Sequence, residues 1–164
     1  MPTFHSTKSV LLIGASRGLG YALAAEYLQR GCHLVATVRG RARTKLHDRL
    51  GTSSGQLEIE TADINFPDQT MALHTRLRGR TFDLLFVNAG VKNDDRETIA
   101  DVATDEFVRV MVTNALSPMR VVESFQGSMP RAERDRVWSG TWHENGLPSG
   151  SFRPSSSPPS VPAH

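Results

Sequence analysis

The sequence predicts an α/β fold in three layers, in which a parallel sheet of about four strands lies between helices and an irregular tail follows. Short apolar runs alternate with helical patterns along residues 8–126, as expected for parallel strands joined by right-handed crossovers. Beyond residue 126, about half of the residues are Pro, Ser or Gly, so the apolar pattern of a packed core is missing. We therefore expect one domain over residues 1–126 and a Pro/Ser-rich tail over residues 127–164.

Four short apolar runs are the predicted strands. They lie at residues 10–13, 33–38, 57–62 and 82–87, and the third alternates with period two.

Helical spacing of apolar residues predicts the helices between these runs. The first helix follows a glycine-rich turn after the first strand. Residues 41–50 are a basic helical candidate, and Pro67 opens a helix to about Arg78, at a position where proline's fixed φ is harmless. The last helix begins at Thr104 and is long and amphipathic, with its apolar side running to Phe125.

Composition and charge exclude several classes of function. Lys plus Arg number 19 and Asp plus Glu 17, a net charge of +2, which gives no basic field for nucleic acid. No apolar run approaches the ~20 residues that span a bilayer, and the six histidines show no zinc-like spacing with each other or with Cys32. A single cysteine fits a reducing compartment. We expect a cytoplasmic protein without a membrane, nucleic-acid or metal site.

The glycine-rich turn is the first candidate site. It reads Gly-Ala-Ser-Arg-Gly-Leu-Gly over residues 14–20, and glycines at this spacing let the backbone turn tightly and approach a pyrophosphate at the helix N-terminus. The strand before the turn and the helix after it favour a dinucleotide site. The alternative is that the glycines serve only the close packing of strand and helix. The candidate cofactor-binding residues of this turn are Gly14, Ser16, Arg17, Gly18, Leu19 and Gly20.

Four features in order along the chain resemble the short-chain dehydrogenase/reductase family, whose domain is Rossmann-like. The first is the glycine turn, and the second is Asp63 after the third strand, which the resemblance implies lies near the adenine ring. Asn88, Ala89 and Gly90 match the family's Asn-Ala-Gly motif beside the cofactor, and Asn114 matches its active-site asparagine. The resemblance covers about three quarters of the chain. It implies that the four predicted strands pair in the spatial order 3-2-1-4 of a doubly wound sheet. It also implies hydride transfer between a nicotinamide and a carbonyl or alcohol carbon.

The end of the second strand favours NADP over NAD. A Rossmann site for NAD generally carries Asp or Glu there, whereas NADP needs cations for its extra phosphate. This strand ends at Arg39, and Arg17 lies within the glycine turn. A planar guanidinium suits phosphate geometry. Arg41 and Arg43 could add charge, although a solvated surface is the simpler interpretation of both. We expect NADP(H) as the cofactor.

Pro118 lies four residues after Asn114, inside the long helix. Because proline has no N–H, the carbonyl of Asn114 loses its intrahelical partner and the helix is expected to kink. In the resembled family, the corresponding asparagine holds a water in the proton relay to the catalytic lysine. The alternative is that Pro118 only bends the helix around the sheet.

The residues that transfer protons in the resembled family are missing from this sequence. The family uses a tyrosine hydroxyl, a lysine four residues later and a serine that holds the substrate oxygen. No tyrosine or lysine follows Asn114. Ser139, Phe152 and Ser156 reproduce the family's spacing, but only the serine at the first position is of the required type. Ser139 therefore stays a candidate catalytic residue beside Asn114.

Several interpretations stay open at this point. Residues 127–164 are either a degenerate catalytic part or a segment read in a shifted frame. The chain is then an NADP(H)-binding oxidoreductase-type protein with impaired catalysis, a non-enzymatic nucleotide-binding or interaction module, or a non-functional truncated product. A sheet cut after four strands leaves the outer edge of the fourth strand and the apolar face of the long helix uncovered. We expect a homo-oligomer or aggregation through that surface.

Overall fold

A parallel sheet forms the centre of the molecule. The structure, a computed structural model, describes residues 8–53, 55–94, 98, 100–130 and 138–139. The sheet has five strands in the order β3-β2-β1-β4-β5, and every neighbouring pair is parallel. The strands are β1 (Ser9–Ile13), β2 (His33–Val38), β3 (Leu57–Thr61), β4 (Leu84–Val87) and β5 (Trp138–Ser139). The predicted strand order 3-2-1-4 is confirmed.

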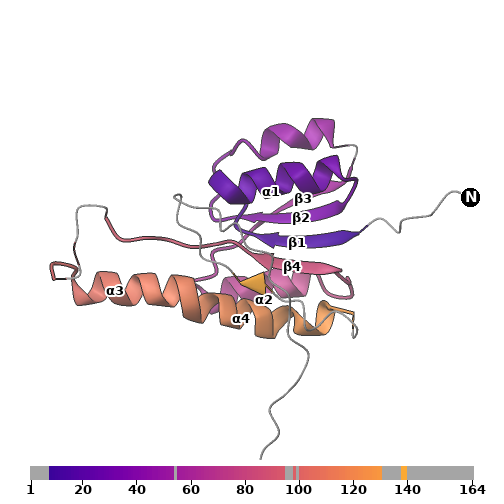
Figure 1. The fold of residues 1–164 in the computed structure, drawn as a ribbon. Helices are drawn as coiled ribbons and strands as arrows, with labels where there is room; N and C mark the ends of the chain where they lie inside the picture. The colour runs from indigo at the N-terminus through magenta and orange to yellow at the C-terminus, as the bar shows by residue number, and fades with distance from the viewer. Residues whose placement is uncertain (1–7, 54, 95–97, 99, 131–137, 140–164) are drawn as a thin grey trace, which may run out of the picture.

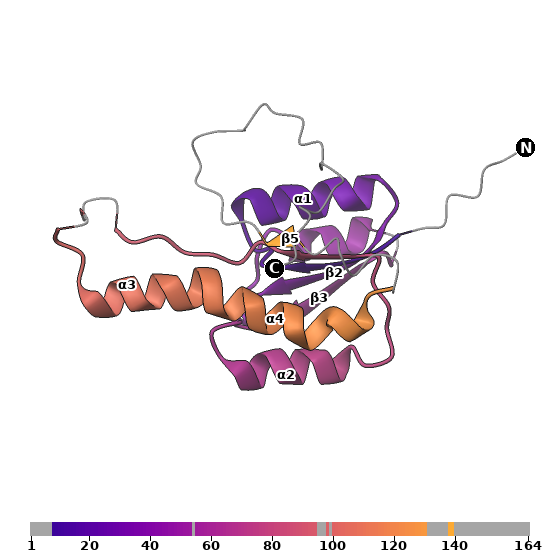
Figure 2. The same cartoon turned by 60° about the horizontal axis from the view of Figure 1, so that its bottom comes forward.

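Helices cover both faces of the sheet and complete the three predicted layers (Figure 1). One face carries α1 and η1, and the other carries α2 and α4 (Figure 2). In both views α3 runs outward, beyond the end of the sheet. The helical segments are α1 (Gly18–Gln29), η1 (His47–Thr52), α2 (Pro67–Arg76), α3 (Thr104–Met111), η2 (Val112–Leu116), α4 (Ser117–Phe125) and η3 (Gln126–Ser128).

The core is divided by the sheet into two apolar clusters. Alternate residues of a strand point to opposite faces, so Leu11 and Ile13 of β1 belong to one cluster and Val10 and Leu12 to the other. Both pairs are almost completely buried. The first strand is continuously apolar because helices cover it on both sides.

Two of the predicted helices differ in the structure. The helix expected over residues 41–50 is absent, and the short 3₁₀ helix η1 begins only at His47. Just before it, Thr44 and His47 are joined by two hydrogen bonds, from the N–H of Thr44 to His47 Nδ1 at 3.0 Å and from the N–H of His47 to the Thr44 carbonyl at 2.9 Å. The long helix after Thr104 is interrupted by a π-helical turn, η2, which ends just before Ser117 and Pro118. A π-helical turn therefore stands where the sequence predicts a kink.

Ion pairs join the edge strand β3 to the last residue of α2 and to the segment that follows it. Arg76 Nε lies 2.8 Å from Glu60 Oε2, and Arg80 Nη1 lies 2.6 Å from Glu58 Oε2. Arg76 also donates a hydrogen bond of 3.1 Å to the carbonyl of Thr61. Charges on an edge strand discourage pairing with another chain.

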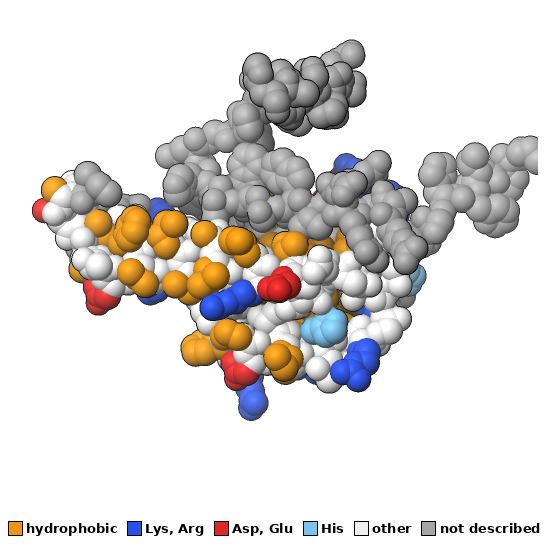
Figure 3. Space-filling model, turned by 90° about the horizontal axis from the view of Figure 1, so that it is seen from below, with side chains coloured by type: hydrophobic (Ala, Val, Ile, Leu, Met, Phe, Trp, Pro, Cys, Tyr) orange, Lys and Arg blue, Asp and Glu red, His pale blue; other side chains and the backbone are white. Residues whose placement is uncertain are grey.

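The opposite side of the molecule carries an exposed apolar stripe along α3, η2 and α4. No residue of α3 is buried. Figure 3 shows hydrophobic side chains in a row along this helical segment. The exposed large members of the stripe are Phe107, Val108, Met111, Leu116 and Met119. The edge of β4 differs from expectation, because the two residues of β5 pair with Phe86 and Val87.

Candidate nucleotide-binding site

The turn after β1 is held to the neighbouring strand by Thr37. The backbone N–H of Gly14 donates to Thr37 Oγ1 at 2.9 Å, and the N–H of Ala15 donates to the Thr37 carbonyl at 2.8 Å. Thr37 is buried in β2. The sequence analysis missed this residue, since a threonine within an apolar run is typical of any strand. Its hydrogen bonds fix where the turn leaves the sheet.

Two of the three glycines in the turn are required by close packing. A Cβ atom on Gly20 would lie 2.0 Å from the carbonyl oxygen of Gly14 and 2.6 Å from Asn88 Nδ2. A Cβ atom on Gly14 would lie 2.8 Å from the backbone of Ala89. Gly18 differs, because the space around it is open and its φ of +54° is what favours glycine. Close packing thus explains Gly14 and Gly20. Gly18 is explained instead by the positive φ at the start of α1.

The N-terminus of α1 has the features of an anion site. Arg17 is its N-cap residue, and no side chain in the described ranges caps the helix. The first turn contains no acidic residue. Free N–H groups and the helix dipole make such a terminus attractive to a phosphate. Arg17, Gly18 and Leu19 are exposed there, and Ser16 is half-buried.

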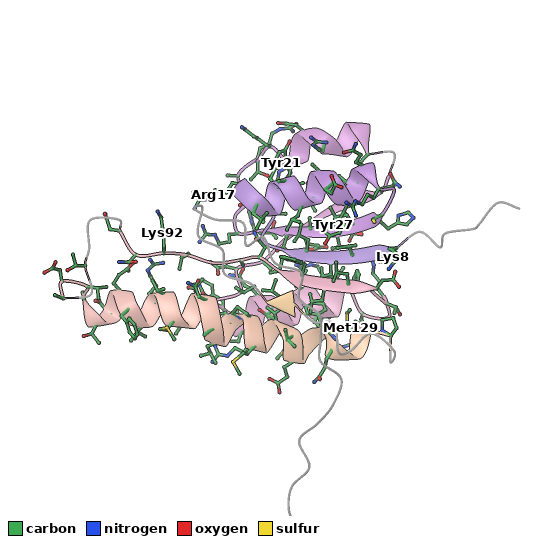
Figure 4. The ribbon with its side chains drawn as sticks, viewed as in Figure 1. Lys8, Arg17, Tyr21, Tyr27, Lys92 and Met129 are labelled. Carbon is green, nitrogen blue, oxygen red and sulfur yellow. The ribbon has the colours of Figure 1, made fainter. Side chains whose placement is uncertain are left out.

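A cavity of about 620 Å³ lies beside this helix terminus. Figure 4 shows Arg17 and Tyr21 together at the end of the sheet opposite Lys8. The cavity joins the glycine turn, the end of β2 and the loop that follows β2. It is lined by Ser16, Arg17, Gly18, Tyr21, Val38, Arg39, Gly40, Ala42, Arg43, Thr44 and Lys45. Three predicted residues of the turn thus line one cavity with Arg39, whereas Leu19 is not among the lining residues.

The cationic side chains around this cavity differ in their partners. Arg43 donates to Asp48 Oδ1 from Nε at 3.0 Å and from Nη2 at 2.8 Å. Within the part of the chain that the structure describes, the side chains of Arg17 and Arg39 form no hydrogen bond or ion pair. Two uncompensated guanidinium groups therefore face a cavity next to a helix N-terminus, where an anion is favoured.

Tyr21 also lines the cavity, although nothing in the sequence marked it as a residue of the site. Its hydroxyl accepts a hydrogen bond of 3.1 Å from Arg49 Nε, and the Arg49 guanidinium carbon lies 5.5 Å from the ring centroid. These contacts join α1 to η1 across one side of the cavity. Neither tyrosine spacing nor charge pattern marks this contact in the sequence, because the two residues lie 28 positions apart.

Asn88 connects the end of β4 to the glycine turn. Its Nδ2 donates to the carbonyl of Gly14 at 2.9 Å, and its backbone N–H donates to the carbonyl of Ile13 at 2.9 Å. Ala89 packs against Gly14, and Gly90 is exposed beside them. The first two residues of the Asn-Ala-Gly motif thus contact the glycine turn directly.

Asn114 braces the segment that follows this motif. Its Oδ1 accepts from the N–H of Val91 at 2.8 Å, and its Nδ2 donates to the carbonyl of Val91 at 2.7 Å. The residue lies in the π-helical turn, where the N–H of Ser117 donates to the carbonyl of Val112. Pro118 has no N–H to donate to the carbonyl of Asn114.

The remaining predicted residues are further from the cavity. Asp63 lies in the turn after β3, where its Oδ1 accepts from the N–H of Asn65 at 3.0 Å and its own N–H donates to Gln69 Oε1 at 2.9 Å. Ser139 lies in β5, with its backbone beside Val87. Phe152 and Ser156 lie outside the described residues.

Metal and membrane features are absent from the described ranges. No group of three or more His, Cys, Asp or Glu side chains there could hold a metal ion. No helix in those ranges has the length and the apolar character needed to cross a membrane.

Comparison with known proteins gives one family. The family model described as short chain dehydrogenase matches residues 8–137. The NADPH-dependent pterin aldehyde reductase of Arabidopsis thaliana is 33% identical over 124 residues, which cover 73% of this chain and 50% of the relative. The chain therefore spans about half the length of such relatives.

Solved structures match the same part of the chain. A structure from Burkholderia multivorans, described as a short-chain dehydrogenase/reductase with bound NADP, is 56% identical with a TM-score of 0.73, over 76% of this chain and 55% of that one. A carbonyl reductase from Pseudomonas aeruginosa PAO1 in complex with NADP is 31% identical with a TM-score of 0.72, over 77% of this chain and 55% of that one. These similarities confirm the Rossmann-like fold.

Proposed function

The chain belongs to the short chain dehydrogenase family, and on that premise we propose that residues 1–126 form a domain that binds NADP(H). The observation that carries this proposal is a pair of guanidinium groups, Arg17 and Arg39, in one cavity beside the N-terminus of α1. Neither has a hydrogen-bond or ion-pair partner among the described residues. Similar structures were solved with NADP bound, which agrees with the proposed ligand.

The pyrophosphate is proposed to lie over the glycine turn, from Gly14 to Gly20. The backbone approaches closely there because Gly14 and Gly20 lack Cβ atoms that would displace it. The N–H groups at the start of α1 supply donors for phosphate oxygens. Thr37 and Asn88 hold the turn from both sides, so the donors are oriented before the ligand arrives.

The 2′-phosphate is proposed to lie between Arg17 and Arg39. A bidentate guanidinium–phosphate contact is among the stronger charge-assisted hydrogen bonds. We propose that the adenine ring lies near Asp63 and the nicotinamide ribose near Asn88, Ala89 and Gly90, as in the family that these residues resemble. Asp63 and Asn88 both follow strands of one parallel sheet, so both lie at the carboxyl edge, where ligands of such sheets bind.

Chemistry beyond binding is proposed to be impaired in this chain. When bound, NADPH would supply a hydride to a carbonyl carbon. Asn114 would hold the segment at Val91 beside the cofactor and leave its own carbonyl to a water. Ser139 would hold a substrate oxygen, but the sequence offers no tyrosine or lysine after Asn114 to transfer the proton. The second candidate is therefore a nucleotide-binding or interaction module without turnover.

Isothermal titration calorimetry with NADP⁺ and NAD⁺ tests the binding proposal. We expect NADP⁺ to bind at least about tenfold more tightly, since one additional charged contact accounts for ~1.4 kcal/mol. Arg39→Met should remove most of that preference. Arg30→Met is the matched control, because Arg30 lies at the far end of α1 and pairs with Glu26. Equal affinity for both nucleotides, or equal effects of the two substitutions, would contradict the proposal.

Oxidation of NADPH in the presence of aldehydes and ketones distinguishes the two candidate functions. No turnover above the buffer background is expected if the chain only binds the nucleotide. Turnover that Asn114→Ala reduces would instead support an active oxidoreductase.

A further inference from the structure

We propose that Lys45 is a third cation for the 2′-phosphate and that Asp48 holds the nearby Arg43 out of that role. This inference rests on the proposed NADP(H) site. Lys45 lines the same cavity as Arg17 and Arg39. Among the described residues, the side chain of Lys45 forms no ion pair or hydrogen bond, and only its backbone carbonyl accepts a hydrogen bond, from the N–H of Asp48. The sequence did not mark Lys45 as a residue of the site.

The position of Lys45 is fixed by its neighbours in the chain. Thr44 is held by His47, whose Nδ1 accepts from the backbone N–H of Thr44 at 3.0 Å and lies 3.0 Å from its hydroxyl. Leu46 is fully buried and belongs to the apolar cluster between the sheet and α1. The backbone of Lys45 is thus anchored on both sides, while its own side chain is exposed. An anchored backbone reduces the entropy that an exposed lysine loses when it binds a ligand.

Arg43 lines the cavity as well, but its charge is already balanced. Both its Nε and its Nη2 donate to Asp48 Oδ1, at 3.0 and 2.8 Å. A phosphate that recruited Arg43 would have to break two hydrogen bonds to a carboxylate and leave Asp48 close to the anion. The negative charges of the Asp48 carboxylate and the phosphate would then repel each other. Lys45 is two residues away and carries no such restraint.

Three uncompensated cations would therefore surround a phosphate monoester from three separate segments. Arg17 comes from the glycine turn, Arg39 from the end of β2 and Lys45 from the loop before η1. A 2′-phosphate carries close to two negative charges at neutral pH, which three cations neutralise better than two. A ribose with a free 2′-hydroxyl would gain little from Lys45. The residue is thus assigned to discrimination between NADP and NAD.

Calorimetric titration of the full chain with NADP⁺, NAD⁺ and adenosine 2′-monophosphate tests this assignment. Lys45→Met should weaken NADP⁺ and adenosine 2′-monophosphate by about five- to tenfold, as expected for one partly exposed charge contact. The affinity for NAD⁺ should change by less than about twofold. Arg41→Met is the matched control, because Arg41 is exposed and removes the same charge without lining the cavity.

A second pair of variants tests the restraint on Arg43. Asp48→Asn should tighten NADP⁺ binding about two- to fivefold, since Arg43 is then free to turn toward the phosphate and a nearby negative charge is lost. The gain should fall when Arg43→Met is added, and Arg43→Met alone should have little effect. No gain from Asp48→Asn, or a loss from Arg43→Met as large as that from Lys45→Met, would overturn the assignment of Arg43.

The two levels of failure can be distinguished. If Arg39→Met abolishes the NADP⁺ preference while Lys45→Met and Arg41→Met behave alike, the proposed site stands and the role of Lys45 is wrong. If neither Arg39→Met nor Lys45→Met changes NADP⁺ binding, the proposed function itself fails. Circular dichroism of each variant would check that a change in affinity does not come from loss of the fold.

Discussion

Substitution of Gly20 by alanine tests whether the glycine turn, Asn88 and α1 form one tightly packed unit. The added Cβ would lie 2.0 Å from the Gly14 carbonyl oxygen, and real Cβ contacts essentially never fall below 3.0 Å. The carbonyl must therefore retreat by roughly 1 Å, which costs about 1–3 kcal/mol by analogy with overpacked cores. The same movement strains the hydrogen bond of 2.9 Å from Asn88 Nδ2, which contributes ~1 kcal/mol. The higher helix propensity of alanine offsets ~1 kcal/mol.

A net loss of about 1–3 kcal/mol in the free energy of unfolding is therefore expected. Thermal unfolding followed by far-ultraviolet circular dichroism would show it as a decrease in Tm of roughly 5–15 °C. Gly127→Ala is the control, because a Cβ there has no neighbour within 4 Å. NADP⁺ affinity should fall in Gly20→Ala as well, since the displaced carbonyl belongs to the phosphate-binding turn. Equal Tm values for the two variants would refute the packing argument.

Three further predictions concern other parts of the molecule. Asn114→Ala removes both hydrogen bonds to Val91 and should lower the free energy of unfolding by about 1–3 kcal/mol; an unchanged urea midpoint would contradict the bracing role. Tyr27 has a raised pKa because burial disfavours its phenolate, with a further contribution from Cys32. The stability from neutral Tyr27 is therefore fully present below its unfolded pKa of about 10. It is lost as pH rises above the unfolded value and through the folded one, so Tyr27→Phe should flatten the decline of Tm above about pH 10; parallel curves for the two proteins would exclude this source. Met119 is 69% exposed in the apolar stripe, and Met119→Lys should reduce self-association in light scattering, whereas Met71→Lys, on the exposed surface of α2, is the comparison. Equal scattering from both variants would show that the stripe is not the contact surface.

The apolar runs of the sequence predicted where the four main strands lie, and the resemblance to the short-chain dehydrogenase/reductase family predicted their order. A parallel strand that is covered on both faces leaves a short apolar run, and residues 10–13 and 33–38 are such runs. Glycine spacing also marked the turn after β1 correctly, because Gly14 and Gly20 are required by backbone distances that no other residue allows. Both the apolar runs and the glycine spacing are features of residues close together in the sequence, so they can be recognised without the structure.

Contacts between distant segments could not be predicted in the same way. Thr37 holds the glycine turn through its hydroxyl, but the same threonine fits any buried strand. Lys45 is one of several basic residues after β2, and its position at the cavity is fixed by the hydrogen-bonded Thr44 and the buried Leu46 on either side of it. The π-helical turn spans Val112–Leu116 and includes Asn114. The proline at 118 predicts a distortion there but not its form.

The ion pairs of Arg76 and Arg80 on β3 have a consequence for how the sheet can be enlarged. The charged side chains of these ion pairs disfavour the pairing of another strand at the edge of β3, so an additional strand is expected to join beside β5 instead. A strand added there would lie on the side of the sheet where α4 contacts β4. The two edges of the sheet are thus expected to differ in assembly, because charged side chains disfavour pairing at β3 and not at β5.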